Sequence, residues 1–200
     1  MRYALLLMLA AVPGTANATA YPSLSCAFTE PFINFSVWPG AASLNTPEST
    51  TLATSLSLSG TELEPVIAAT IAGTPVRLEI ENVPGGDGMS DFESPLTGHL
   101  RGRSGGAQSG ACVRFPDGTA PRPVIGVGST DQLMVRVSGS ARARTVGSIH
   151  SRGRFWAFPE PMVRGWARGA FEEVPAGESG RITVRIGWVN ARFLGRVGAR

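Results

Sequence analysis

Residues 76–81 read Val-Arg-Leu-Glu-Ile-Glu, with apolar and charged side chains at alternating positions. Because successive side chains of a β-strand point to opposite faces, this stretch predicts a strand that buries Val76, Leu78 and Ile80 on one face. Residues 51–58 show the same alternation through four members, Leu52, Thr54, Leu56 and Leu58. Both stretches predict half-buried antiparallel strands.

Further strand candidates lie at residues 32–38, which are aromatic and β-branched, and at residues 66–72 and 96–101. The chain contains 25 glycines and 15 prolines among 200 residues without a triplet period, which indicates many turns. No stretch shows a convincing helical pattern. The sequence therefore predicts an all-β fold, with a small barrel or sandwich over residues 19–116.

The first 18 residues have the features of a secretory signal. A Met-Arg start precedes an apolar run at residues 3–12, and Ala-Asn-Ala at residues 16–18 predicts cleavage after Ala18. Neither this run nor any other apolar stretch approaches the roughly 18 residues of a membrane span. We expect a periplasmic or secreted protein with no membrane segment after cleavage.

Two cysteines, Cys26 and Cys112, are present, and an even number in an exported chain favours a disulfide over the alternative of a metal pair. Such a bond would close the first module. The two histidines, His99 and His150, lie outside any ligand-like cluster, so we expect no metal site. No motif for a cofactor is found, and none is expected.

Charge divides the chain. Residues 19–99 hold nine acidic residues and one arginine, whereas residues 100–200 hold sixteen arginines and six acidic residues. A turn and proline cluster at residues 117–123 predicts a linker between a module at 19–116 and a second at 124–197. The basic second half favours an anionic partner, and export argues against nucleic acid. Whether the modules pack through their opposite charges stays open.

Three motifs of the first module resemble an uncharacterised family of exported bacterial proteins. They are Cys-Ala-Phe-Thr-Glu-Pro-Phe at residues 26–32, Asp-Gly-Met-Ser-Asp at 87–91 and Gly-Ala-Cys at 110–112. The family has a tryptophan where Ile33 stands and begins its second motif with a cysteine where this chain has glycines. The surviving outer cysteines support a bond between Cys26 and Cys112. The resemblance implies a compartment and a β-rich fold, but no reaction.

The acidic residues of these motifs have a structural interpretation. Asp87 and Asp91 are expected to satisfy backbone groups in a tight turn, with acid–base work or calcium binding as the alternatives. Glu30 is expected to be partly buried and to pair with Arg77, the one arginine before residue 100 apart from Arg2.

The second module resembles a divergent bacterial SH3-like domain. The resemblance rests on residues 124–149 and on Gly-Trp-Val-Asn-Ala-Arg-Phe-Leu at residues 187–194. It departs where residues 137–139 lack the usual proline, and residues 163–185 are longer than a typical hairpin. It implies a five- to six-stranded barrel and a wall-peptide partner.

Aromatic side chains and arginines are concentrated in this module and predict an aromatic groove with a basic rim. The candidate binding residues are Arg152, Arg154, Phe155, Trp156, Phe158 and Trp166. Trp188 and Phe193 are expected in the core, because a small barrel needs large side chains to fill it.

We expect no catalytic residues. Gly-Arg-Ser-Gly-Gly at residues 102–106 matches a nucleophile pattern but lacks the strand–turn–helix context and an oriented histidine base. The favoured function is an exported binding or scaffold protein that contacts peptidoglycan or an envelope protein. The alternatives are a lysozyme-inhibitor-like protein acting through the first barrel and an accessory cell-wall enzyme using Asp87 or Asp91.

Overall fold

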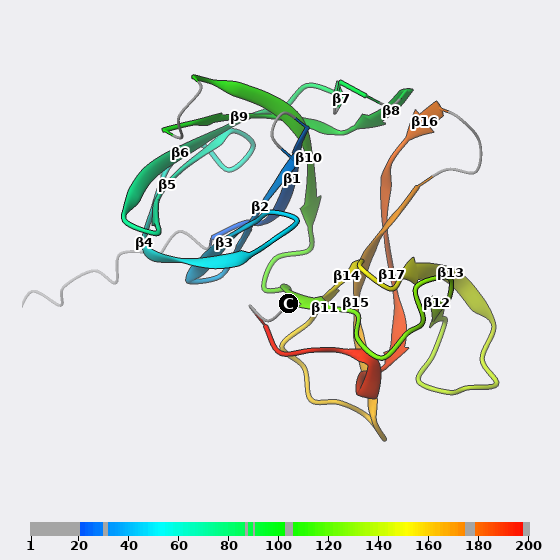
Figure 1. Ribbon diagram of the computed structural model, residues 1–200. Helices are drawn as coiled ribbons and strands as arrows, with labels where there is room; N and C mark the ends of the chain where they lie inside the picture. Colours follow the sequence, from blue (N-terminus) through cyan, green and yellow to red (C-terminus); the bar gives the residue numbers. More distant parts are fainter. Residues whose placement is uncertain are drawn as a thin grey trace, which may run out of the picture.

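The computed structural model describes residues 21–29, 32–86, 88–89, 91–102, 106–174 and 179–197. The predicted signal, Glu30, Asp87 and residues 103–105 lie outside the described residues. The described chain consists of strands and one short 3-10 helix (Figure 1). The expected all-β fold is confirmed, and of the barrel and the sandwich predicted for the first module the structure has a closed barrel.

Eight antiparallel strands form the closed barrel in the order β1-β10-β9-β6-β5-β4-β3-β2. Their bounds are β1 (Ser23–Thr29), β2 (Phe32–Trp38), β3 (Ala41–Asn45), β4 (Thr50–Gly60), β5 (Pro65–Ile71), β6 (Thr74–Glu81), β9 (Leu96–Arg101) and β10 (Gln108–Phe115). As the alternation of residues 76–81 predicts, Val76, Leu78 and Ile80 are buried in the barrel. The interior therefore follows from the period-two pattern of its strands.

The prediction for β4 is wrong at Leu52, which is 49 % exposed. The pairing of β4 with β5 shifts register between Ala53 and Ser55. An irregularity of this kind changes which side chains face inward, so Ala53 packs on the core before the shift and Leu56 and Leu58 pack on it afterwards.

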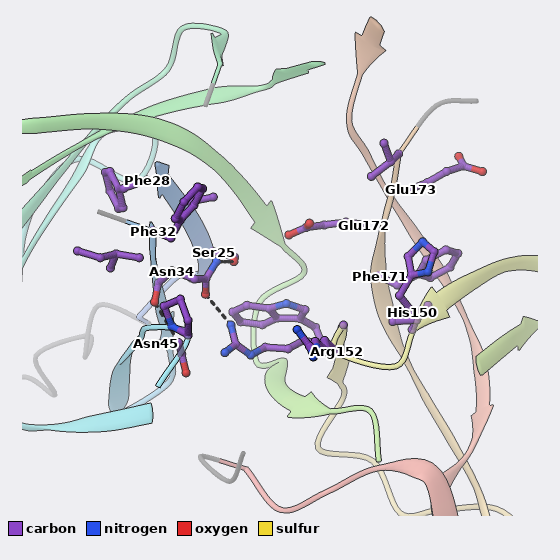
Figure 2. Close-up of a pocket in the computed structure, with 18 of the residues that line it drawn as sticks. Ser25, Phe28, Phe32, Asn34, Asn45, His150, Arg152, Phe171, Glu172 and Glu173 are labelled. Carbon is purple, nitrogen blue, oxygen red and sulfur yellow. Dashed lines mark hydrogen bonds between the residues drawn. The ribbon is translucent and has the colours of Figure 1, made fainter. Parts of the chain in front are cut away.

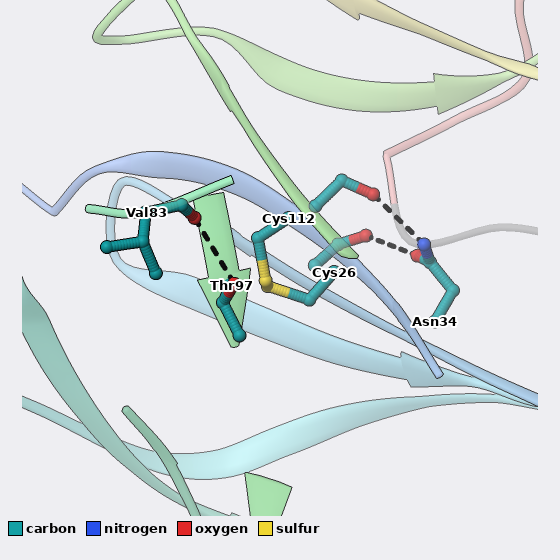
Figure 3. Close-up of a disulfide and its surroundings, with 7 residues drawn as sticks. Cys26, Asn34, Val83, Thr97 and Cys112 are labelled. Carbon is teal, nitrogen blue, oxygen red and sulfur yellow. Dashed lines mark hydrogen bonds between the residues drawn. A yellow bond between two sulfur atoms is a disulfide. The ribbon is translucent and has the colours of Figure 1, made fainter. Parts of the chain in front are cut away.

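The predicted disulfide is confirmed. Cys26 and Cys112 are directly opposite each other on β1 and β10, and their sulfur atoms are bonded inside the barrel (Figure 3). Both cysteines are completely buried. Gly98 on β9 lies against the two sulfur atoms, so the interior leaves no room there for a side chain.

The second module is a six-stranded sheet in the order β11-β14-β15-β17-β12-β13. Its elements are β11 (Ala120–Pro123), β12 (Gln132–Arg136), β13 (Thr145–His150), β14 (Arg154–Ala157), β15 (Trp166–Glu173), β17 (Thr183–Asn190) and the 3-10 helix η1 (Ala191–Phe193). Its core includes Val135, Phe155 and Phe171. Residues 120–123, which the sequence places in a linker, form β11 and pair with β14.

A small third sheet joins the two modules. β16 (Ser179–Arg181) lies between β15 and β17 in sequence and pairs in parallel with β8 (Asp91–Ser94), which pairs with β7 (Gly85–Gly86). Figure 1 shows β16, in orange, reaching from the second module to the green β8. We call the segment between β15 and β17 the arm. The arm accounts for the unusual length of residues 163–185.

The modules also pack directly on each other. Trp38, Val113 and Phe115 belong to barrel strands but lie on the outer face, where they form one buried cluster with Trp156 and Ala170. The rings of Phe115 and Trp156 stack with centroids 4.1 Å apart. The contact is therefore largely apolar rather than an attraction between opposite charges.

Candidate functional site

A cleft of about 970 Å³ lies between the barrel and the second module. On the barrel side its lining includes Phe32 and Asn34 of β2 and Asn45 of β3. On the other side it includes Arg154 of β14 and Glu172 of β15. Figure 2 shows Glu172 across the cleft from Asn34 and Asn45. We call this cavity the intermodule cleft. Ligand sites are frequent in such concave surfaces between domains.

Part of the barrel wall of the intermodule cleft belongs to a hydrogen-bonded polar network around Asn34. The Asn34 amide donates to Ser25 Oγ (3.0 Å), and Asn34 Oδ1 accepts from Ser36 Oγ (2.9 Å). Asn45 Nδ2 donates to the Asn34 carbonyl oxygen (3.1 Å). Asn34 Oδ1 also accepts from Arg154 Nη1 across the module boundary (2.6 Å). This network holds Arg154 at one end of the cleft.

Glu172 and Arg154 are charged residues of the cleft lining, and each affects the pKa of the other. Water reaches the exposed Glu172 side chain, but the surrounding protein atoms desolvate the carboxylate and raise its pKa, with a partial opposing effect from Arg154. Desolvation also lowers the pKa of Arg154, and Glu172 counteracts it. In Figure 2 Glu172 points into the cleft, whereas Glu173 points away. Glu173 is paired with Arg185 at 2.6 Å.

A second cavity, of about 520 Å³, lies within the second module. We call it the module-two groove. Trp166 of β15 and Phe193 of η1 supply its aromatic lining. Asp131, Arg136 and Arg192 supply charged groups, and the Arg192 guanidinium lies 4.4 Å from the Phe193 ring centre. The groove therefore combines flat apolar surface with charges of both signs.

The six candidate binding residues do not form one surface. Phe155 is completely buried in the core of the second module, so its assignment to a binding surface is wrong. Trp156 is buried against Phe115 and only borders the intermodule cleft, so its ring is not available for stacking on a ligand. Phe155 is covered by the core of its own module, whereas Trp156 is buried because the outer face of the barrel packs against β14.

Of the other four candidates, three line one of the two cavities, and Phe158 lines neither. Arg152 and Arg154 line the intermodule cleft, and Trp166 lines the module-two groove. Phe158 is half-buried with the Arg168 guanidinium 5.3 Å from its ring centre. The single binding surface predicted from the sequence therefore combines residues of two separate cavities.

Trp188 and Phe193, expected in the core, are only half-buried. Phe193 packs partly on the core and lines the module-two groove. Trp188 lies beside Gly139, close to Trp166. The core of this sheet is filled mainly by Phe155 and Phe171 instead.

The structural assignments of the first module are tested in part. Glu30 and Asp87 lie outside the described residues. Arg77 pairs with Glu79 on the same face of β6 at 2.7 Å, and this hydrogen bond lowers the pKa of Glu79. Asp91 is exposed at the start of β8, where it lies opposite Ser179 of β16.

Two residues of the cleft, Asn34 and Glu172, are not among the candidates predicted from the sequence. Asn34 and Ser36 alternate with apolar residues, which is typical of a strand face in contact with water. Glu172 stands in a Phe-Glu-Glu run without any motif. Nothing in the local sequence indicates that these side chains line a cleft between two modules.

Comparison with known proteins gives no match to a family model, a curated protein or a solved structure. Within the part of the chain that the structure describes, no helix is long and apolar enough to cross a membrane. The same residues contain no group of three or more histidine, cysteine, aspartate or glutamate side chains placed to hold a metal ion.

Proposed function

We propose that this protein is an exported, non-catalytic binding protein of the cell envelope whose second module contacts peptidoglycan, or an envelope protein carrying a similar peptide. The observation that carries the proposal is the module-two groove, in which Trp166 and Phe193 lie beside Arg136, Arg192 and Asp131. The resemblance of this module to bacterial SH3-like domains supports the same ligand class.

The chemistry of the groove suits a short peptide. Aromatic side chains contribute large contact areas at low cost in conformational entropy, so Trp166 and Phe193 serve as anchors. Arg136 and Arg192 attract carboxylates, and Asp131 attracts an amino group. The stem peptides of peptidoglycan carry both kinds of group. Residues 190, 192 and 193 of the SH3-like motif all line this groove.

The test is co-sedimentation of residues 19–200 with insoluble peptidoglycan over a series of salt concentrations. The full mature chain is required, because a fragment lacking the barrel would expose Trp156, which Phe115 covers. We expect Trp166→Ala to weaken pelleting about tenfold or more, as for an interface hot spot. Added salt should weaken it further because the groove carries two arginines.

Phe158→Ala is the matched control, because it removes an aromatic ring that is not part of the groove. Equal losses for the two variants, or no pelleting of the unmodified protein, would overturn the proposal for peptidoglycan. Inhibition of lysozyme at equimolar protein would then favour the first barrel as the active part. Release of soluble label from labelled peptidoglycan would contradict a non-catalytic role.

A further inference from the structure

The intermodule cleft is a preformed cavity distinct from the module-two groove. Among the residues that line them, the two cavities share only Gln132. The hydrogen bond between Arg154 and Asn34 and the stacked pair of Phe115 and Trp156 connect the modules beside the cleft. The arm holds the modules together a second time through the pairing of β16 with β8. A cleft between two such attachments keeps its shape without a ligand.

The cleft contains cationic groups with spare hydrogen-bonding capacity. Arg152 is exposed, and it forms no hydrogen bond or ion pair with any of the described residues. Arg154 uses one Nη1 hydrogen bond for Asn34, and a guanidinium has five N–H donors. Two guanidinium groups two residues apart at one wall are suited to a carboxylate, which arginine binds with paired hydrogen bonds.

The cleft also has an exposed apolar rim. Phe32 of β2 is 59 % exposed, Met89 is 68 % exposed and Val174, just after β15, is 52 % exposed. All three line this cavity although they come from distant parts of the chain. An exposed phenyl ring beside polar groups offers a flat surface for the C–H face of a sugar ring.

Glu172 restricts the ligand further. Its side chain points into the cleft, where it can accept hydrogen bonds from hydroxyl or amide N–H groups (Figure 2). The same carboxylate disfavours ligands with several negative charges, such as polyphosphates, because like charges repel in a partly desolvated site. The cleft is thus matched to a single negative charge combined with several polar groups and an apolar ring face.

We propose that the intermodule cleft binds a saccharide that carries one carboxylate. Arg152 and Arg154 hold the carboxylate, Phe32 packs against the sugar ring and Glu172 accepts hydrogen bonds from its hydroxyl or N-acyl groups. This proposal does not depend on the function proposed for the module-two groove, because different residues make the contacts.

The test uses two sugars that differ by one acidic group. N-acetylmuramic acid is N-acetylglucosamine with an added lactyl carboxylate, so the pair measures carboxylate recognition directly. Binding to residues 19–200 is followed by chemical-shift titration at neutral pH and low salt. We expect the acid to bind about tenfold or more tightly than the neutral sugar, as charge-assisted hydrogen bonds require.

Variants locate the site. We expect Arg152→Gln to reduce the affinity for the acid to nearly that for N-acetylglucosamine. Arg144→Gln removes the same charge from an exposed position that lines neither cavity, and it should leave binding unchanged. Because Arg152 is exposed and has no partner among the described residues, its replacement should not unfold the protein. Circular dichroism melting of each variant checks this.

Equal affinities for the two sugars, no detectable binding of either, or the same loss in the Arg152→Gln and Arg144→Gln variants would overturn the proposal. The outcomes are separable from those for the module-two groove. Trp166→Ala should leave binding of the acid intact, and Arg152→Gln should leave pelleting with peptidoglycan intact. The second expectation is reasonable because intact peptidoglycan has its lactyl carboxylate condensed with the stem peptide.

Discussion

At the scale of single residues, the Glu172 side chain is exposed to water, yet nearby protein atoms partly desolvate its carboxylate. Desolvation raises its pKa above the ordinary value of 4.5, so protonation of Glu172 is easier in the folded protein than in the unfolded chain. The charged and titratable groups that also line the cleft are His150, Arg152, Arg154 and Glu173. Of these, Arg154 opposes the shift through its positive charge.

The sign of the pH effect follows from this shift. The stability associated with protonated Glu172 is complete below the unfolded-state pKa and is lost as pH rises through the higher folded-state pKa. We therefore expect Glu172→Gln to melt at a higher temperature than the unmodified protein at pH 7, with the difference vanishing near pH 4. The difference should be small, because water screens the charge of this exposed side chain. A lower melting temperature at pH 7 would show that attraction to Arg154 dominates.

At the scale of elements, the disulfide connects β1 and β10, which are neighbours in the closed barrel. It closes a loop of 86 residues. We expect the double variant Cys26→Ala and Cys112→Ala to lose about 2–5 kcal/mol of unfolding free energy, because the unfolded chain regains the freedom that the bond removes. Equilibrium unfolding in urea measures the loss.

Reduced, unmodified protein is the control for this element. Its urea midpoint should fall near that of the double variant, since both lack the same cross-link. An unchanged midpoint in the double variant would contradict the prediction, because it would show that the bond gives no net restriction of the unfolded chain.

At the scale of the whole molecule, the barrel and the second module share a buried cluster and a three-stranded sheet. We expect a single calorimetric unfolding transition whose midpoint is nearly independent of salt, because the shared cluster is apolar. Phe115→Ala should lower the free energy of unfolding by about 3–5 kcal/mol, because it removes a buried ring from the contact between the two modules. It should also lower the transition of the whole chain or separate it into two.

Phe32→Ala is the matched control for this prediction, because Phe32 lies on the same barrel but is largely exposed. This variant should change the free energy of unfolding by less than about 1 kcal/mol. Two separate transitions in the unmodified protein would show that the modules unfold independently despite their contacts.

The class of fold could be predicted because strand periodicity is a local property. The alternation of Val76, Leu78 and Ile80 is present in the sequence itself, and it identifies the inward face of β6. The same rule failed at Leu52, because an irregular pairing between β4 and β5 shifts the register without any local signal. The candidate site was predicted only in fragments, with Arg152 and Arg154 in one cavity and Trp166 in another.

By itself, the sequence determined that the chain is β-rich and that Cys26 and Cys112 were available to pair. Only the tertiary structure decided which outward-facing side chains are covered. Asn34 and Arg154 are separated by 120 positions, yet they meet across the module boundary. The physical reason is that a period of two specifies the face of a strand on which a side chain lies, but not what packs against that face. The packing of one module against the other decides that Trp156 is buried, that Arg152 stays exposed and that a cleft forms between the modules.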